Sequence, residues 1–463
     1  MDFLEKAHQK CWQILPISPT SYGDSPYQSF SVHAGNPYFI DLEALEKEGY
    51  LKPAEYKDIE WGDDKGSVDY GKIYEVIFKV LRTAHKRFRK KPEKAYSKFV
   101  VENKDWIYDY ALFMSLKFAN KGKAWYEWDE PLKMYKPKAI KSARKEYAND
   151  IDFWCFVQYK YFQQWKKLKA YANEKGIEII GDIPIYVAYD SVEVWSTPQY
   201  FSLDKEKKPV EVAGCPPDAF TAYGQLWGNP LYNWEYIARD KFRWWVERIK
   251  AASDTYDVVR IDHFRGFESY YCIPYGAKNA KKGKWRKGPD MRLFKEVRKQ
   301  LGDVKIIAED LGFLTKHVVK MLNASGYPGM KVLEFGFDSD NTNGYLPHNF
   351  KTTNSICYTG THDNETILGW IKSCDEKTRS YCKDYLGVTK DEFVPWAMVR
   401  LCWSSVCDTA IAQMQDILCL DDKARMNTPS TVGANWKWRL ESFDKLDDTL
   451  AERLAKITAV YGR

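Results

Sequence analysis

The pattern of apolar and polar positions along the chain alternates between short apolar runs and longer amphipathic stretches. The apolar runs predict seven buried strands, at residues 13–17, 177–183, 256–261, 304–308, 330–335, 355–358 and 417–420. Between these runs, apolar residues recur at helical spacing, as in 153–171 and 242–252. Strands that alternate with helices are typical of β/α units on a parallel sheet, so the pattern predicts an α/β fold.

Two long intervals do not fit a minimal barrel of such units. Residues from about 61 to 150 read as mainly helical, and residues from about 184 to 236 read as irregular and rich in Pro, Gly, Trp and Tyr. In a (β/α)8 barrel of the TIM type, insertions after strands rise from the face that holds the active site. We therefore expect one catalytic barrel domain, residues 1–463, in which these large insertions form the walls of a groove.

Composition narrows the class of partner. Aromatic residues make up 16% of the chain, and we expect most in the core and some in a groove, where flat rings stack on sugars or bases. The net charge of +6 comes from interleaved acidic and basic residues, so nucleic-acid binding is not implied. The densest basic run, 278–287, reads as a solvated surface loop.

The chain carries no sequence signal for a membrane or for a secretory route. No run of about 18 apolar residues is present, and the first residues read as the start of an amphipathic helix rather than as a signal peptide. The ten cysteines are scattered without CxxC pairs or metal-ligand spacing. We expect a cytoplasmic protein with reduced thiols.

Carboxylates follow three of the predicted strands. Asp262 ends the run at 256–261, Glu309 ends the run at 304–308, and Asp363 follows the run at 355–358. Arg260 lies two residues before Asp262, and therefore on the same strand face, where its charge would keep Asp262 ionised. Three carboxylates at strand ends predict that all three line one shared active-site opening.

A pair of carboxylates suits chemistry at a glycosidic bond, which needs one group to attack and one acid to protonate the leaving oxygen. Asp262 beside Arg260 suits the ionised role, and Glu309 after an apolar run suits the proton donor. Asp363, next to His362, would orient sugar hydroxyls or stabilise developing positive charge. Taken singly, each residue is equally well read as a carboxylate that caps the next helix.

Other chemistries find less support. A divalent-cation site prefers several carboxylates without an arginine among them, and Arg260 argues against it. No phosphate-binding glycine loop and no Gly-x-Ser-x-Gly motif are present.

Longer motifs resemble one family along nearly the whole chain. They lie at residues 15–20, 22–31, 34–37, 181–185, 213–218, 224–232, 260–268, 308–312, 328–335, 359–365 and 426–438. The family is the 4-α-glucanotransferases called amylomaltase or disproportionating enzyme, members of the α-amylase superfamily. The acidic motifs are shared across the superfamily, whereas Tyr-Gly-Asp-Ser-Pro-Tyr-Gln-Ser at 22–29 and Pro-Pro-Asp at 216–218 are specific to this branch.

The resemblance implies roles for individual residues. It implies that Asp262 is the nucleophile that forms a covalent ester, that Glu309 is the general acid/base, and that Asp363 is the third carboxylate. Residues implied to contact sugar or to flank these three are Arg260, His362, Asp182, Tyr27, Ser25, Trp227, Asn229 and Asp218, the last in a loop that folds over the cleft. For Ser25 and Tyr27 the competing interpretation is a loop that packs on itself, which is the stronger for Ser25, and for Trp227 it is a core aromatic.

The implied activity is transfer of α-1,4-glucan segments between maltooligosaccharides by a retaining double displacement, without a nucleotide, metal or other cofactor. An α-glucan hydrolase on the same fold and a non-catalytic glucan-binding protein are the alternatives. The hydrolase would be expected to carry strands after Leu440, where this chain reads as a helix at 444–460. Family members begin with a further strand and loop, so we expect a barrel that lacks its first strand at the N-terminus and is poorly stable.

Overall fold

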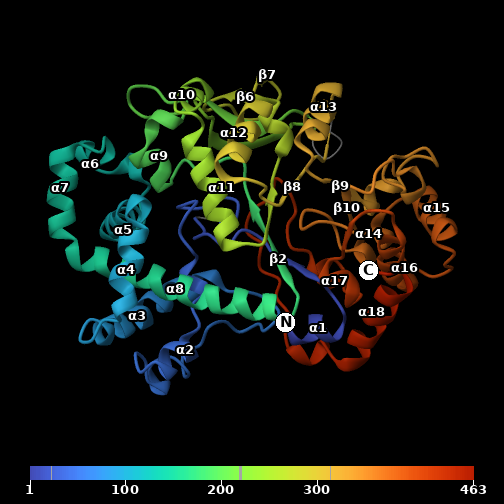
Figure 1. Cartoon of the computed structure of the whole chain (residues 1–463), viewed down its shortest axis with the longest axis horizontal. Coiled ribbons are helices and arrows are strands. Elements are labelled where there is room, and N and C mark those ends of the chain that lie inside the picture. The colour runs from blue at the N-terminus through green and yellow to red at the C-terminus, as the bar shows by residue number, and fades with distance from the viewer. Residues whose placement is uncertain (22, 218–221, 313) are drawn as a thin grey trace.

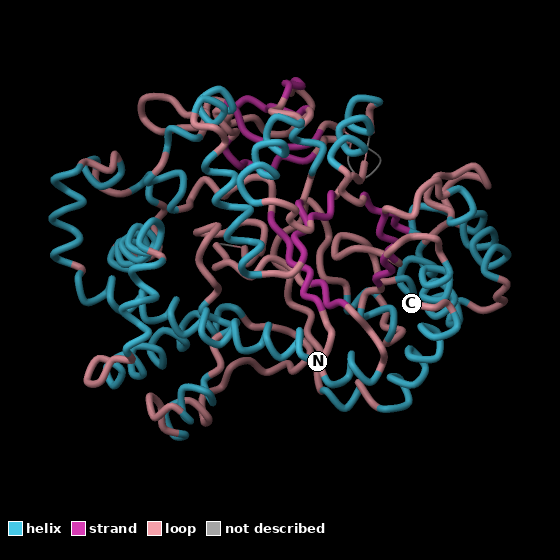
Figure 2. Tube along the Cα trace, viewed as in Figure 1, coloured by secondary structure: helices cyan, strands magenta, loops and turns pink. Residues whose placement is uncertain are grey.

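A computed structural model describes residues 1–21, 23–217, 222–312 and 314–463 (Figure 1). Two parallel sheets lie at its centre, surrounded by helices (Figure 2). The four-stranded sheet has the order β1 (Cys11–Gln13), β2 (Glu178–Ile183), β5 (Val258–Ile261), β8 (Ile306–Ala308). The three-stranded sheet has the order β11 (Thr409–Ile411), β10 (Ser355–Tyr358), β9 (Gly329–Val332).

The two sheets adjoin where β8 meets the start of β9. The amide of Ala308 donates to the carbonyl of Pro328 over 3.0 Å. The strands are short and mostly buried, as is usual for parallel strands covered by helices. The mixed α/β fold agrees with the sequence pattern, whereas closure into an eight-stranded barrel and the lack of a first strand stay predictions.

One predicted strand is wrong. The apolar run at 417–420 lies at the end of helix α17 (Met414–Ile417) and in the turn that follows, where Cys419 has a φ of +53°. The seventh parallel strand is β11, upstream of this run. A four-residue apolar run has no period that separates a strand from a buried helical turn. Two further bounds also differ. β1 ends at Gln13 and so shares only that residue with the predicted run 13–17, and the chain leaves β9 for a 3₁₀ turn at Leu333–Gly336.

Helices α8 (Ala148–Glu174) and α11 (Arg243–Thr255) pack against β2, and α11 also packs against β5. The predicted helical stretches 153–171 and 242–252 are therefore confirmed. Gly181 of β2 permits a close approach, because a Cβ atom there would lie 2.2 Å from the ring of Tyr256. This contact lets Tyr256, which lies between α11 and β5, pack directly against β2.

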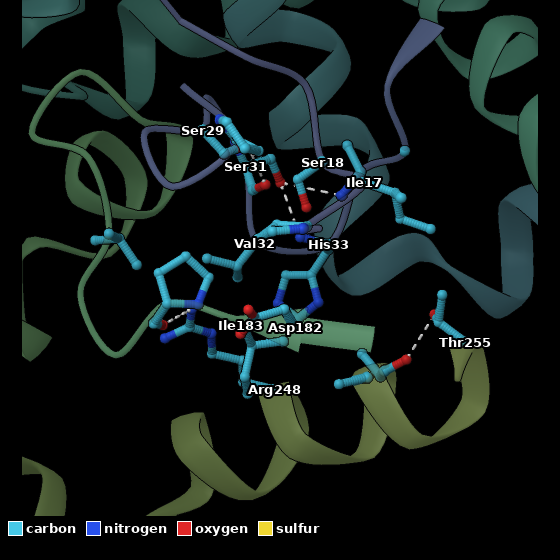
Figure 3. A pocket seen from close by; sticks show the side chains of 18 of the residues that line it. Ile17, Ser18, Ser29, Ser31, Val32, His33, Asp182, Ile183, Arg248 and Thr255 are labelled. Carbon is cyan, nitrogen blue, oxygen red and sulfur yellow. Dashed lines mark hydrogen bonds between the residues drawn. The ribbon is translucent and has the colours of Figure 1, made fainter. Parts of the chain in front are cut away.

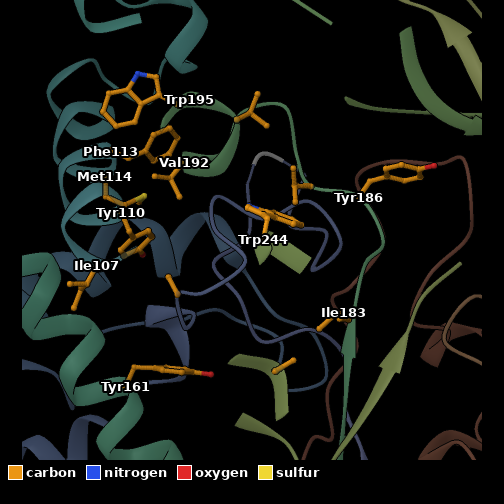
Figure 4. Packing of buried hydrophobic residues seen from close by; sticks show 14 of the residues in the cluster. Ile107, Tyr110, Phe113, Met114, Tyr161, Ile183, Tyr186, Val192, Trp195 and Trp244 are labelled. Atoms are coloured by element: carbon orange, nitrogen blue, oxygen red, sulfur yellow. The ribbon is translucent and has the colours of Figure 1, made fainter. Parts of the chain in front are cut away.

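The interval from 61 to 150 folds into a helical layer beside α8 (Figure 1). Its helices are α3 (Tyr70–Phe88), α4 (Lys94–Glu102), α5 (Lys104–Ala119), α6 (Glu130–Lys133) and α7 (Pro137–Glu146), preceded in the chain by α2 (Leu42–Lys47). The layer is held by large rings, as where Phe113 of α5 meets Trp195 at 5.8 Å between ring centroids (Figure 4). Burial of each such side chain contributes about 1.5–3 kcal/mol.

The interval from 184 to 236 is more regular than its sequence indicated. It contains α9 (Val192–Ser196), β3 (Glu211–Cys215), β4 (Gln225–Pro230) and the start of α10 (Trp234–Arg239). The two strands join β6 (Ser269–Pro274) and β7 (Lys284–Lys287) in an antiparallel sheet of order β4-β3-β6-β7. β3 pairs with β4 inside the interval and with β6 from a later part of the chain, and the irregular composition of 184–236 indicated neither strand.

The remaining helices complete the cover of the sheets. They are α1 (Asp2–Lys6), α12 (Met291–Leu301), α13 (Lys316–Ser325), α14 (Ile367–Ser373), α15 (Glu376–Leu386), α16 (Val394–Ser404) and α18 (Asp448–Val460). The predicted C-terminal helix is thus confirmed as α18, which packs against α1. Among the described residues, no helix combines the length and the apolar character needed to cross a membrane.

Candidate active site

The register of the parallel strands brings the acidic strand ends together. Ile261 pairs with both Ile183 and Ala308, so Asp262 and Glu309 each lie one residue beyond a paired position on neighbouring strands. The amide of Glu309 donates to the carbonyl of Ile261 over 3.0 Å, which continues the ladder to this point. Neighbouring strands are about 4.8 Å apart, so the two carboxyl groups arise from adjacent backbone positions.

Arg260 connects two of the carboxylates. Its guanidinium is buried and bonds the carboxylate of Asp182, its partner across the β2–β5 ladder. The same Nη1 atom lies 3.2 Å from Oδ1 of Asp262. The hydroxyl of Tyr27 donates to Oδ2 of Asp182 over 2.8 Å, which ties the N-terminal loop to the same group.

Glu309 is held by two backbone amides in a dry position. The backbone amide of His263 donates to Oε2 of Glu309, and the backbone amide of Leu311 donates to Oε1, both over 2.7 Å. His263 adopts a left-handed backbone with a φ of +51°, within the turn that aims its N–H at Glu309. Burial, reinforced by the nearby charge of Asp262, raises the pKa of Glu309 to about 8.

Asp262 titrates at a lower pH than Glu309. Burial raises its pKa to about 6, the Arg260 charge opposes this, and Asp182 adds to it. Around neutral pH, Asp262 is therefore mostly ionised and Glu309 mostly protonated. Two carboxyl groups whose environments separate their pKa values in this way can act as a base or nucleophile and as an acid.

Asp363 comes from the end of β10, on the turn that also carries His362. The His362 ring stacks on Tyr27 with 5.1 Å between centroids and 21° between planes, and Trp436 lies 5.8 Å from it. Asn427 Nδ2 donates to Oδ1 of Asp363 over 2.6 Å. The side chain of Asp363 remains 49% exposed, so it is open to a ligand.

Two residues predicted to contact a ligand, Trp227 and Asn229, differ in their surroundings. Trp227 on β4 meets the edge of His263 at 4.9 Å and donates from Nε1 to Oε1 of Gln225. Asn229 is buried, and its amide is used within the protein, by Gln28 at 3.0 Å and by the carbonyl of Val187 at 2.8 Å.

Ser25 and Asp218 complete the predicted set. Ser25 Oγ accepts from the amide of Tyr27 over 3.3 Å, as expected of a loop that packs on itself. Asp218 lies outside the described residues.

A small cavity of about 50 Å³ borders Asp182 and Tyr27. Figure 3 shows Ser31, His33 and Arg248 beside it, together with Asp182 from β2. Oδ1 of Asp182 is buried without a hydrogen-bond partner among the described residues, and a cavity of this size has room for water to supply one.

Several contacts were not foreseen from the sequence. Gln28, Asn427 and Trp436 lie in stretches that carry the family resemblance, but no role was inferred for them. They sit in irregular loops whose partners are far along the chain, so spacing contains no signal for these contacts. The one local indication in the sequence is that polar and aromatic residues occur together in Met426–Trp438, as side chains that contact sugars often do.

Comparisons with known proteins identify the family of this chain. A family model described as 4-alpha-glucanotransferase matches residues 1–445. A 4-alpha-glucanotransferase from Clostridium butyricum is 48% identical over 100% of this chain and 95% of its own length. The chloroplastic/amyloplastic 4-alpha-glucanotransferase DPE1 of Arabidopsis thaliana is 39% identical over 100% of this chain and 81% of its own length.

A solved structure is also similar to this chain in its backbone. Amylomaltase from Streptococcus agalactiae in complex with acarbose superposes with a TM-score of 0.97 at 42% identity, over 100% of this chain and 94% of that one. The similarity covers both sheets and all the strand ends described above. The chain belongs to the 4-alpha-glucanotransferase family.

Proposed function

We propose that this chain transfers α-1,4-glucan segments between maltooligosaccharides by a double displacement through a glycosyl ester on Asp262. The family membership supports the transferase activity. The observation that carries the assignment of residues is the division of protonation states between Asp262 and Glu309 at two neighbouring strand ends. A retaining reaction needs this combination of a carboxylate and a carboxylic acid.

In the first step, the carboxylate oxygen of Asp262 attacks the anomeric carbon of the donor sugar. The glycosidic bond breaks, its electron pair stays with the leaving oxygen, and Glu309 donates its proton to that oxygen. The leaving glucan departs with a free 4-hydroxyl, the donor segment remains as an ester on Asp262, and Glu309 is left ionised.

In the second step, the 4-hydroxyl of an acceptor glucan attacks the same carbon. Glu309 now takes the hydroxyl proton, the ester bond to Asp262 breaks, and the original configuration is restored. Both carboxyl groups return to their starting states, so the cycle needs no oxidant and no cofactor.

The surrounding residues support these steps. Arg260 holds Asp262 ionised, and Tyr27 with Asp182 fixes the position of Arg260. Asp363 is placed to accept sugar hydroxyls and to stabilise positive charge at the anomeric carbon. Transfer exceeds hydrolysis when the bound acceptor excludes water from the ester, and we assign this bias to the aromatic residues around Trp227 and Trp436.

Maltooligosaccharides are the proposed ligands. The amylomaltase structure from Streptococcus agalactiae was solved with acarbose, and we extend sugar binding at the corresponding strand ends to this chain. The scattered cysteines favour a reducing, cytoplasmic setting for the reaction.

The test is the product pattern from maltotriose. The chain is expected to produce glucose together with a ladder of longer maltooligosaccharides, visible by thin-layer chromatography. Asp262→Ala is expected to remove both. Products that are only shorter than maltotriose would favour the hydrolase, and an active Asp262→Ala variant would contradict the assignment of the nucleophile.

A further inference from the structure

A buried pair of polar side chains, Glu334 and Asn364, lies beside the catalytic strand ends. Glu334 sits in the 3₁₀ turn after β9 and is 8% exposed. Its amide donates to the carbonyl of Thr359 over 3.3 Å, at the end of the neighbouring strand β10. Its Oε1 accepts from Nδ2 of Asn364 over 2.8 Å. The pair thus links the end of one strand to the turn that follows the next.

Asn364 closes the turn that carries two of the candidate site residues. Its Oδ1 accepts from the amide of Thr361 at 2.9 Å and from the hydroxyl of Thr361 at 2.8 Å. The backbone amide of Asn364 donates to the backbone carbonyl of Thr361 over 3.1 Å. His362 and Asp363 are the two residues inside this closed turn. Their position therefore depends on the side chain of Asn364.

Glu334 fixes which way the amide of Asn364 faces. The oxygen of that amide meets two donors from Thr361, so the nitrogen must point to an acceptor, and Glu334 supplies it. A flipped amide would set donors against donors and an oxygen against the carboxyl group. With an apolar residue at 334, the buried Nδ2 would lose its acceptor and the amide would be free to rotate.

We propose that Glu334 is a positioning residue for the transfer reaction, which acts through Asn364 to hold His362 and Asp363 at the reacting centre. This inference rests on the proposed function. It assigns Glu334 no contact with substrate and no proton transfer. Its effect is on geometry, since small displacements of groups around a reacting centre reduce turnover strongly.

The environment of Asp262 provides a readout that general destabilisation does not change. The charged and titratable groups that face Asp262 are Arg260, Asp182, Tyr27, Glu309, His362 and Asp363. His362 lowers and Asp363 raises the pKa of Asp262, and both reside on the turn held by Asn364. Release of the turn therefore shifts the acid limb of the pH–rate profile.

Glutamine is the conservative replacement at this position. Burial raises the pKa of Glu334 to about 8, and the hydrogen bond from Asn364 opposes this shift. The charged neighbours of Glu334 are Glu365, Asp416 and Arg425. The side chain is therefore mostly neutral around pH 7. Glutamine is also neutral, has the same shape and presents an oxygen to Asn364.

The experiment compares Glu334→Leu, Glu334→Ala and Glu334→Gln with the unaltered chain, using kcat and KM for maltotriose from about pH 5 to pH 9. Leu and Ala are both made because one fills the space and the other leaves it to water. Each is expected to lower kcat by about 10- to 100-fold with a smaller change in KM, and to move the acid limb. Glu334→Gln is expected to stay within about 3-fold of the unaltered chain with its acid limb in place.

A double-mutant cycle with Asn364→Leu tests the route of the effect. If Glu334 acts through Asn364, the double variant Glu334→Leu/Asn364→Leu is no slower than Asn364→Leu alone. His85→Leu is the matched control, because it removes a partly buried 2.8 Å bond to Asp152 in the helical layer. It is expected to lower the melting temperature and to leave the acid limb unchanged.

Three results would overturn the positioning role. They are unaltered kcat and acid limb in both Glu334→Leu and Glu334→Ala, equal impairment of Glu334→Gln and Glu334→Leu, or additive losses in the double variant. Asp262→Ala separates this outcome from failure of the proposed function. An inactive Asp262→Ala together with an unimpaired Glu334→Leu refutes only the positioning role, whereas an active Asp262→Ala refutes the assignment of the nucleophile.

Discussion

Replacing Glu309 with glutamine is expected to abolish transfer and, at the same time, to remove a loss of stability that the original chain undergoes as the pH rises. Glutamine has the shape of glutamic acid but does not ionise. In the native structure, burial holds the pKa of Glu309 near 8, well above its ordinary value of 4.5. A group whose pKa is raised by folding favours the folded state at low pH, and this contribution is lost as the pH rises through the folded pKa.

The size of the effect follows from the two pKa values. Between pH 4.5 and pH 8 the unfolded chain releases the Glu309 proton while the folded chain retains it. Over this window the original chain should lose about 3–5 kcal/mol of unfolding free energy relative to Glu309→Gln. The amide replaces one of the oxygens that accept from His263 and Leu311, which costs about 1–3 kcal/mol at every pH. The pH dependence of the difference is therefore the quantity to measure, rather than its value at one pH.

Urea denaturation, followed by tryptophan fluorescence, measures the two chains side by side at about pH 5, 6, 7 and 8. The difference in unfolding free energy should move in favour of Glu309→Gln at each step. Because Asp262 and Glu309 interact, the slope reports on the pair. A difference that stays constant with pH, or that moves in favour of the original chain, would refute the reasoning that burial keeps Glu309 protonated.

Three further predictions concern turnover of maltotriose. The kcat/KM profile should rise through about pH 6 as Asp262 ionises and fall through about pH 8 as Glu309 loses its proton, and a flat profile would contradict the assignment. Arg260→Met removes a cation 3.2 Å from Asp262, so the acid limb should move to higher pH by about 1–2 units after screening by water, and an unmoved limb in a folded variant would argue against this role. Tyr27→Phe removes the 2.8 Å bond to Asp182 but keeps the ring on His362, so kcat/KM should fall by about 5-fold, whereas an unchanged value would show that the bond is dispensable.

Much of the fold was predictable because buried parallel strands read as short apolar runs, whereas helices repeat an apolar face. The buried runs that became β2, β5, β8 and β10 are bounded by helices long enough to repeat their apolar face. The failure at 417–420 arose where a run was too short to show any period. The pairing of β3 with β6 in the antiparallel sheet could not be seen in the sequence, since these two strands come from separate segments and their pairing depends on tertiary packing.

The candidate site was predictable where chemistry follows directly from a strand end. Asp262 and Glu309 directly follow neighbouring strands of one parallel sheet, and Asp363 follows β10 of the other sheet, close enough for its charge to act on Asp262. Contacts made by loops were not predictable in the same way. Asn229 is predicted to contact a sugar, and the structure adds that its side-chain amide hydrogen-bonds Gln28, a partner that the sequence did not indicate. Such a choice depends on which partner lies within hydrogen-bonding distance, and that information is absent from one sequence.

The most direct test of the central claim is to capture the ester on Asp262. In Glu309→Gln, a maltotriosyl fluoride donor needs no acid because fluoride leaves unaided, while the missing base slows transfer to an acceptor. The account predicts that proteolysis and mass spectrometry will find one maltotriosyl group on the peptide that contains Asp262. The absence of any adduct while fluoride is released, or an adduct on Asp182 or Asp363 instead, would contradict it.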